Sequence, residues 1–232
     1  MRPSPTVPRV LLDGVTGARV IDQDEPWSSS ISGGRWGDGD PSGELLDVGG
    51  RVVLPGLVDA HTHLDKAFLA DELEEMGIEA DGLAEAIDAV KQFKEAKGAD
   101  IDGMLARAER ALTGMQRAGT VAARTHAEVD PVTGLEPITA QVELAARWAG
   151  RVDLQLVAFP QNGLEADGAK DLLLAGLDAG CSVVGACPYV DDDPAAHIAW
   201  AADVAVDRGL PLDLHLDFSD DAGDAWVDEL LA

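Results

Sequence analysis

The chain alternates short apolar segments of strand length with longer segments whose apolar positions recur at helical spacing. The short runs have the length and the β-branched content of buried strands, and they lie at about 54–60, 120–126, 153–159, 181–187 and 211–217. Apolar positions at helical spacing occupy 67–118, 138–150, 168–180 and 193–209. Strands that alternate with helices form parallel sheets with crossover helices. The pattern therefore predicts an α/β fold with about five parallel strands.

The first part of the chain has a different pattern, with short β-like pieces and no helical periodicity. These pieces lie at 7–14, 17–22 and 44–54. Residues 28–43 between them are rich in Gly, Ser, Asp and Pro, which is typical of a loop or a flexible insertion. We therefore expect residues 1–53 to form part of one domain and residues 54–232 to form another.

The composition fits a globular protein and excludes several classes of partner. Of the 232 residues 46% are hydrophobic, yet no apolar run is long enough to span a bilayer and the N-terminus carries no apolar signal segment. A cytoplasmic location is the expectation. The 43 acidic against 17 basic residues give a formal charge of −26, which repels nucleic-acid phosphates and anionic lipid. The sequence thus predicts no nucleic-acid and no membrane partner.

The two cysteines lie in one apolar stretch, Cys181 to Cys187. Six residues along a strand separate their Cα atoms by far more than the roughly 7 Å that a disulfide allows. We expect two buried free thiols in a reducing compartment.

Candidate chemistry begins at the end of the first apolar run, where His61 and His63 are two residues apart. In an extended chain such a pair presents both imidazoles on one side. Neutral imidazole nitrogens bind divalent metals, so the pair is a candidate metal site, although the tripeptide alone is more typical of two ordinary surface or core histidines.

The longer string PGLVDAHTHLDK, residues 55–66, resembles the first barrel strand of the amidohydrolase superfamily, and HTHLDK in particular resembles its cytosine deaminase-like branch. The segments TVAARTHAEVD, DLQLVAFPQNG, CSVVGACP and PLDLHLD follow in the order and spacing of the second to fifth strands of those enzymes. The resemblance covers the chain from about residue 44. It implies a partial TIM-type (β/α) barrel of about five strands, preceded by part of a small β-sandwich, whereas a closed barrel has eight strands.

The same resemblance implies a set of site residues. His61, His63 and His215 would hold one divalent metal ion, with zinc or iron favoured by histidine ligands. Gln161 would hydrogen-bond the amide edge of a small-molecule substrate, or it caps a loop. His126 would orient ligands or substrate, or it bonds to a neighbouring strand. His215 has an ordinary strand-end histidine as its alternative.

Two departures from the branch pattern bear on catalysis. The family's catalytic glutamate follows the fifth-strand histidine by three residues, and Phe218 stands there. Asp217 is adjacent, and it is a substitute carboxylate only if the strand end bends. The segment CSVVGACPYV contains no lysine, which favours one metal over a lysine-bridged pair. The helical His197 is expected on the surface or in packing.

Two functions remain open from the sequence. The first is a metal-dependent amidohydrolase or deaminase that hydrolyses a non-peptide C–N bond of a small cyclic amide, amidine or amine, cytosine deaminase-like. The second is a truncated, non-catalytic metal-binding relative, or a fragment that needs a second half. A homo-oligomer or a complementing second half is the corresponding partner. The later metal-binding aspartate of the family has no counterpart in these 232 residues.

Overall fold

The computed structural model describes residues 14–18, 27–32, 35–37, 45–49, 51–79, 81–217 and 226–227, and side chains from residue 47 onward within these ranges except at positions 83 and 84. The chain divides into two compact units, Met1–Pro55 and Gly56–Ala232. Each unit is described by itself. None of the described helices is long and apolar enough to cross a lipid bilayer.

The first unit contains a four-stranded sheet. Its strands are β1 (Gly14–Ala18), β2 (Trp27–Ser32), β3 (Arg35–Gly37) and β4 (Leu45–Asp47), in the order β3-β2-β1-β4. β1 is antiparallel to β2 and parallel to β4. The β-like pieces expected at 7–13 and 19–22 lie outside the described residues.

The expectation of a loop at 28–43 is wrong for its first half, because β2 and β3 pair there. The two strands are antiparallel, with Ser30 opposite Gly37 and Ile31 opposite Trp36. Ladder hydrogen bonds use backbone groups that every non-proline residue carries. Serine and glycine therefore join a sheet when a neighbouring strand supplies partners, although the same composition is typical of turns.

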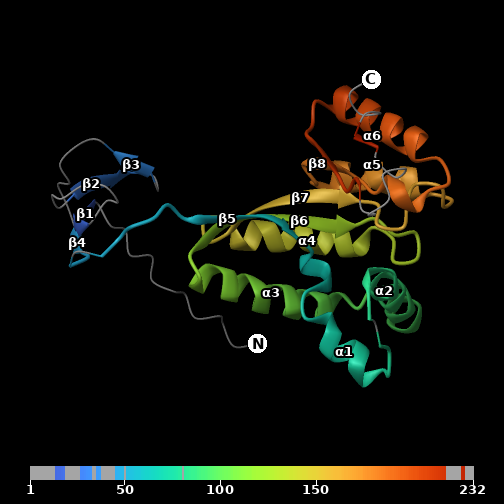
Figure 1. Ribbon diagram of the computed structural model, residues 1–232, viewed down its shortest axis with the longest axis horizontal. Helices are drawn as coiled ribbons and strands as arrows, with labels where there is room; N and C mark the ends of the chain where they lie inside the picture. The colour runs from blue at the N-terminus through green and yellow to red at the C-terminus, as the bar shows by residue number, and fades with distance from the viewer. Residues whose placement is uncertain are drawn as a thin grey trace. The chain divides into compact units, whose positions relative to one another are not determined.

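The second unit is built on five parallel strands, which confirms the predicted partial barrel. They pair in the order β5-β6-β7-β8-β9, and Figure 1 labels β5 to β8. The strands are β5 (Leu57–Thr62), β6 (Thr120–Glu128), β7 (Asp153–Phe159), β8 (Val183–Ala186) and β9 (Leu212–Leu214). Every neighbouring pair is parallel. Their carboxyl ends therefore meet at one edge, where sites of such barrels gather.

Helices connect the strands, as the periodicity predicted. Between β5 and β6 lie the short 3-10 helix η1 (Leu64–Lys66) and the helices α1 (Leu69–Glu75), α2 (Leu83–Lys97) and α3 (Ile101–Arg117). The later crossovers contain α4 (Glu136–Trp148), α5 (Ala169–Ala179) and α6 (Pro194–Arg208), with η2 (Pro188–Val190) before α6. α3 and α4 pack on each other and on β6.

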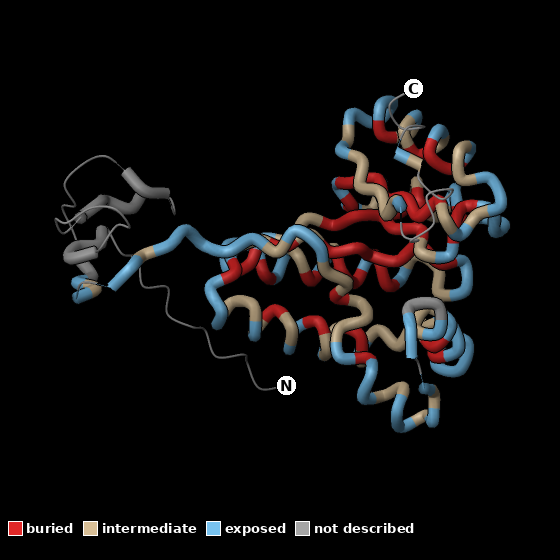
Figure 2. The backbone as a smooth tube through the Cα atoms, in the orientation of Figure 1, coloured by how far each residue is buried: buried red, intermediate tan, exposed pale blue. Residues whose placement is uncertain are grey.

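Burial is concentrated in the middle strands. Figure 2 shows β7 and β8 almost wholly buried toward their ends, whereas β5 is largely exposed. Gly185 in β8 illustrates how closely the strands pack, because a Cβ there would lie 2.6 Å from the carbonyl oxygen of Ala158 and 2.9 Å from Cα of Phe159. Only glycine fits such an approach. Cys181 and Cys187 are free and buried, and burial raises the pKa of these thiols to about 12 and about 11.

A candidate metal and substrate site at the strand ends

The histidine pair of β5 is arranged as an extended chain predicts. His61 is the penultimate residue of the strand and His63 follows its end. The two Nε2 atoms lie 3.3 Å apart. Two nitrogens that bind one zinc at about 2.0–2.1 Å in tetrahedral geometry lie about 3.3–3.4 Å apart. The pair is therefore spaced as two ligands of one ion are.

His215 lies beside His61 and His63, although it follows β9, at the opposite edge of the sheet from β5. β9 ends at Leu214, and the N–H of His215 still donates to the carbonyl oxygen of Ala186 on β8 at 3.0 Å. Its ring centroid lies 4.7 Å from that of His61 and 5.9 Å from that of His63. The structure thus brings together three residues that are up to 154 positions apart, from His61 to His215.

His126 lies beneath this group, fully buried at 0% exposure. Its Nε2 is 2.9 Å from Oδ1 of Asp213, and its Nδ1 is 3.2 Å from the carbonyl oxygen of Thr62. Both of these neighbours accept hydrogen bonds. The ring of His126 therefore lies between β5 and β9 with an acceptor facing each nitrogen, whereas the rings of His61, His63 and His215 remain to bind a ligand.

The distances between possible ligand atoms, taken alone, select a set of three histidines that contains His126 in place of His63. One nitrogen each from His61, His126 and His215 lie within 4.8 Å of one another. We favour His61, His63 and His215 as ligands because both nitrogens of His126 face acceptors, and because Nε2 of His61 already faces Nε2 of His63.

The environment of His61, His63 and His215 favours the neutral form of their imidazoles. Burial lowers the pKa of His63 to about 2 and the pKa of His215 to about 4, and it lowers the pKa of His61 as well. Neutral imidazole is the form that donates a lone pair to a metal. Among the described residues, Nδ1 of His63 and Nδ1 of His215 are buried without a hydrogen-bond partner. The donor set therefore fits a divalent ion.

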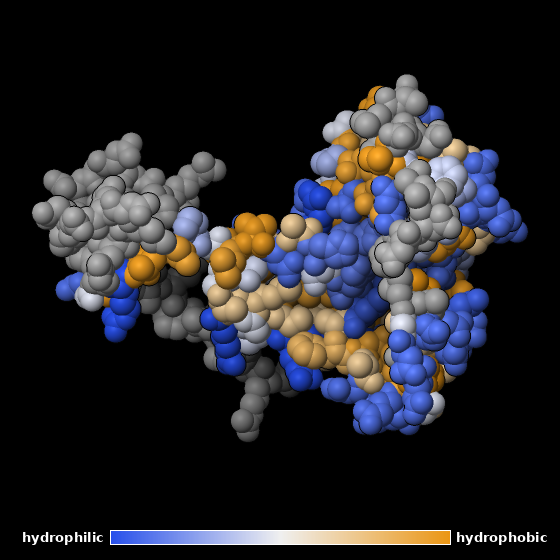
Figure 3. All heavy atoms as spheres, in the orientation of Figure 1, coloured by the Kyte–Doolittle hydropathy of each residue, from blue (hydrophilic) through white to orange (hydrophobic). Residues whose placement is uncertain are grey.

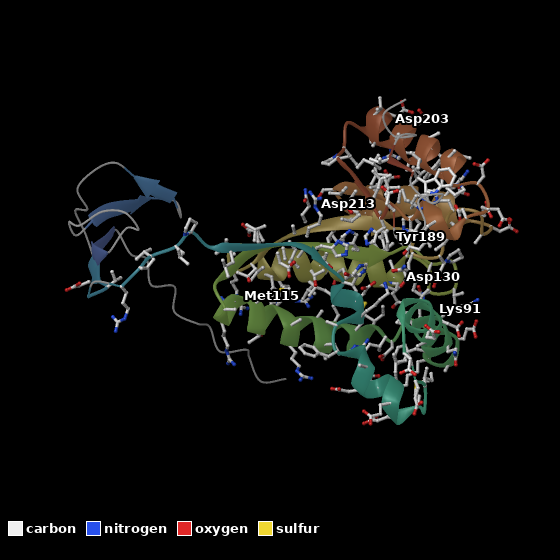
Figure 4. All side chains as sticks on the ribbon, in the orientation of Figure 1. Lys91, Met115, Asp130, Tyr189, Asp203 and Asp213 are labelled. Carbon is white, nitrogen blue, oxygen red and sulfur yellow. The ribbon has the colours of Figure 1, made fainter. Side chains whose placement is uncertain are left out.

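A cavity of about 350 Å³ opens beside the cluster. Besides His61, His63 and His215, its lining residues are Lys66, Ala86, Ile87, Val90, Lys94, Glu128, Gln161, Asn162 and Tyr189. Gln161 thus lies where the sequence predicted a substrate-binding amide. Its side chain hydrogen-bonds that of Tyr189, whose pKa is raised by burial. Figure 4 labels Tyr189, after the end of β8, and Asp130, beyond the end of β6.

A chain of buried charges forms one wall of the cavity, and the sequence reasoning missed it. Nζ of Lys66 lies 2.9 Å from Oε2 of Glu128, and Nζ of Lys94 lies 2.6 Å from Oε1 of the same carboxylate. Lys94 also pairs with Asp130. Both lysines lower the pKa of Glu128 against the opposing effect of burial. A usable signal existed, because Glu128 follows His126 by two residues at a strand end and so shares its face.

The structure does not bring Asp217 into the cavity lining. β9 ends before it, and Asp217 adopts a left-handed φ of 53°. Its Oδ1 instead accepts the N–H of Trp226 at 2.6 Å. Phe218 lies outside the described residues. His197 is buried in packing, and Nδ1 lies 2.7 Å from Oδ2 of Asp191.

The described strands form a partial (β/α) barrel, and the histidine cluster lies at their carboxyl ends, where the sites of such barrels gather. Residues 44–156 match the model of the amidohydrolase family. The chain is 31% identical over 176 residues to the N-isopropylammelide isopropyl amidohydrolase of Pseudomonas sp. (strain ADP). The aligned region covers 74% of this chain and 40% of that protein. The chain spans about 40% of the length of the curated relatives it matches.

Solved structures agree. The N-isopropylammelide isopropylaminohydrolase of Burkholderia multivorans superposes with a TM-score of 0.78 and 28% identity, over 94% of this chain and 56% of that one. The 5-methylcytosine deaminase of Klebsiella pneumoniae, solved with phosphonocytosine, superposes with a TM-score of 0.80 and 25% identity, over 94% and 54%. These matches confirm the resemblance to the amidohydrolase superfamily and to its cytosine deaminase-like branch.

Proposed function

We propose that this chain carries the metal-binding half of a hydrolase that cleaves a non-peptide C–N bond of a small cyclic amide, amidine or amine. The observation that carries the proposal is the convergence of His61, His63 and His215 beside a cavity that contains Gln161. His61, His63 and His215 would hold one divalent ion, zinc or iron. Such an ion supplies an acidified water for hydrolysis when it is bound.

The remaining residues of the cavity have separate tasks. Gln161 presents an amide that can pair with the amide edge of a ring, and its bond to Tyr189 limits how that amide rotates. The pKa of Lys66 is raised by Asp65 and Glu128 against the effect of burial, so its ammonium keeps its charge. A fixed positive charge beside the histidines stabilises negative charge that develops on a substrate oxygen. His126, held by Asp213, supports the rings above it.

The proposal is tested by metal content and by turnover. We expect the purified protein, loaded with zinc or ferrous iron, to hold one ion per chain and to release ammonia or an amine from a panel of aminopyrimidines and cyclic amides. His63→Ala should lose the ion, whereas His126→Gln should retain it. An ion that survives His63→Ala but is lost from His126→Gln would exclude our ligand set, and an associated protein that holds the ion but hydrolyses no compound of the panel would exclude the reaction.

The alternative is that this chain needs a second half to complete the barrel, and the surface at the edge strands β5 and β9 favours it. β5 and β9 each pair with one strand of the described sheet. Leu57 and Val58 on β5 are 52% and 68% exposed, and Figure 3 shows apolar side chains on the surface there. Unpaired edges and exposed apolar patches are typical of a surface that another segment covers. We propose further strands, from a complementing half or a second copy, at these edges.

Light scattering tests this part of the proposal. We expect the isolated 232-residue chain to associate, and a stable monomer that turns over substrate would refute the need for a second half.

A further inference from the structure

The helix α2 presents partly buried apolar side chains to the cavity, next to the ones that it buries against the body of the unit. Ala89 and Phe93 are buried against the body of the unit, at 0% and 4% exposure. Ala86, Ile87 and Val90 are only partly buried, and all three line the cavity. Ala86 and Val90 are four residues apart and Ile87 and Val90 are three apart, so the three side chains lie within one sector of the helix. The helix therefore presents an apolar wall to whatever occupies the cavity.

A buried ion-pair network holds this wall in place. Lys94, one turn beyond Val90, inserts its ammonium between the carboxylates of Glu128 and Asp130, and all three side chains are 11% exposed or less. Nδ2 of Asn162 donates to both carboxylates, at 3.2 and 3.3 Å. Removing one partner of such a network leaves buried charges without compensation, which is strongly unfavourable. Lys94 thus fixes α2 to the end of β6.

The other lining residues are polar. Gln161, Lys66 and Tyr189 approach the cavity from the strand ends and their loops. A ligand that satisfies both sides needs a hydrogen-bonding edge and an apolar part. A ring without a substituent offers little area to three aliphatic side chains, whereas an alkyl group on its nitrogen fills such a wall.

We propose that α2 is the specificity wall of the site and that it receives an N-alkyl substituent of the substrate. The preferred substrates are then N-alkyl cyclic amides or amidines rather than their unsubstituted counterparts, with Ile87 and Val90 as the selective residues. This inference rests on the proposed function. Burial of three alkyl carbons at the usual hydrophobic increment predicts a preference of roughly fiftyfold.

A matched pair of ligands tests the wall. N-isopropylammelide and ammelide share one triazine ring and differ by the isopropyl group. Their dissociation constants are measured by calorimetry on the metal-loaded full chain, and turnover of each is measured as release of the amine or of ammonia. We expect the isopropyl compound to bind about fiftyfold more tightly, and we expect Ile87→Asn and Val90→Asn each to reduce that ratio at least tenfold.

Two lysines on the same helix provide the control. Lys94→Met should reduce the ratio because the wall is released, whereas Lys91→Met should keep it, since Lys91 is exposed (Figure 4) and outside the lining. Thermal unfolding of each variant separates loss of the wall from loss of the fold. Val90→Asn provides the same readout where Ile87→Asn does not fold.

The outcomes separate the two proposals. Equal affinities for the two ligands, or a ratio unchanged in both asparagine variants, overturns the specificity wall while turnover of ammelide leaves the proposed function intact. If neither ligand binds and no cyclic amide of the panel is hydrolysed, both proposals fall.

Discussion

His197 offers the sharpest test of how the loops of the site are held. Its ring is buried on α6, with Nδ1 bonded to Oδ2 of Asp191 at 2.7 Å and Nε2 accepting the N–H of Cys187 at 3.3 Å. Asp191 in turn accepts the N–H of Leu164. The ring thus connects the loop after β8 to the loop after β7, and these loops carry Tyr189 and Gln161.

The cost of replacing His197 by Leu follows from these bonds. The charged carboxylate of Asp191 loses a hydrogen bond from the neutral ring, worth about 1.5–3 kcal/mol, and the buried N–H of Cys187 is left unsatisfied at about 1–3 kcal/mol. Leucine fills most of the ring volume, so the cavity term is small. We expect a loss of about 3–5 kcal/mol in the free energy of unfolding. Urea unfolding followed by tryptophan fluorescence measures it.

The pH dependence of the free energy of unfolding tests the same hydrogen bonds of His197 independently. Because Nε2 accepts a hydrogen bond, the folded ring is neutral, and burial lowers the pKa of His197, while Asp191 and Glu165 raise it and Lys170 lowers it. A lowered folded pKa means that the unfolded chain binds the proton first. Stability is therefore full above about pH 6.5 and falls as the pH is reduced below it. In His197→Leu, the contribution of this histidine to the fall of unfolding free energy with decreasing pH should disappear.

A matched variant controls for the helix itself. Val206 on α6 is 80% exposed, and Val206→Ala should change stability by no more than about 0.5 kcal/mol. The reasoning is refuted if His197→Leu costs less than about 1 kcal/mol, or if its acid slope equals that of the wild type.

Two further predictions concern the same unit. Gly163→Ala should cost at least about 2 kcal/mol in urea unfolding, because the φ of Gly163 is +83° and the added Cβ would overlap Oδ1 of Asp191. Gly134→Ala is the control, with a φ of +68° and open space around the added Cβ, and it should cost about 1 kcal/mol. Equal costs for the two variants would contradict the overlap. Asp213→Asn should cost about 1 kcal/mol at pH 7, since hydrogen bonds from His126 and Arg124 lower the pKa of Asp213 to about 2 against the effect of burial, and solvent screens part of the pair. That difference should vanish as the pH falls from 4 to 2, and a difference constant with pH would refute the ion pairing.

Most of the barrel could be predicted because its strands and helices differ in period. The alternation of apolar runs with helical segments predicted parallel strands, and the resemblance to the amidohydrolase superfamily indicated His61, His63 and His215 as one set. The position of Asp217 could not be predicted, because β9 ends at Leu214 and the backbone beyond it is no longer a strand. The ends of elements depend on tertiary contacts that periodicity does not contain.

The wall of the cavity could not be predicted for a related reason. Lys94 lies in a segment that looks like any amphipathic helix, and its partners Glu128 and Asp130 are 34 and 36 residues away. A lysine on a helix is usually solvated, so only the packing of α2 over the strand ends shows that this one is buried. The hairpin of β2 and β3 was missed because its residues have low strand propensity.

Because the apolar wall and the histidines belong to different elements, the substrate preference of such a site can change separately from its histidine cluster. All four clustered histidines lie at the ends of strands, whereas the apolar wall belongs to one contiguous helix joined to the unit by its own ion pairs. Residues 83–97 therefore form a replaceable cassette. Exchange of that helix, with the lysine retained, can alter which molecules are accepted while the apparatus for hydrolysis stays as it is.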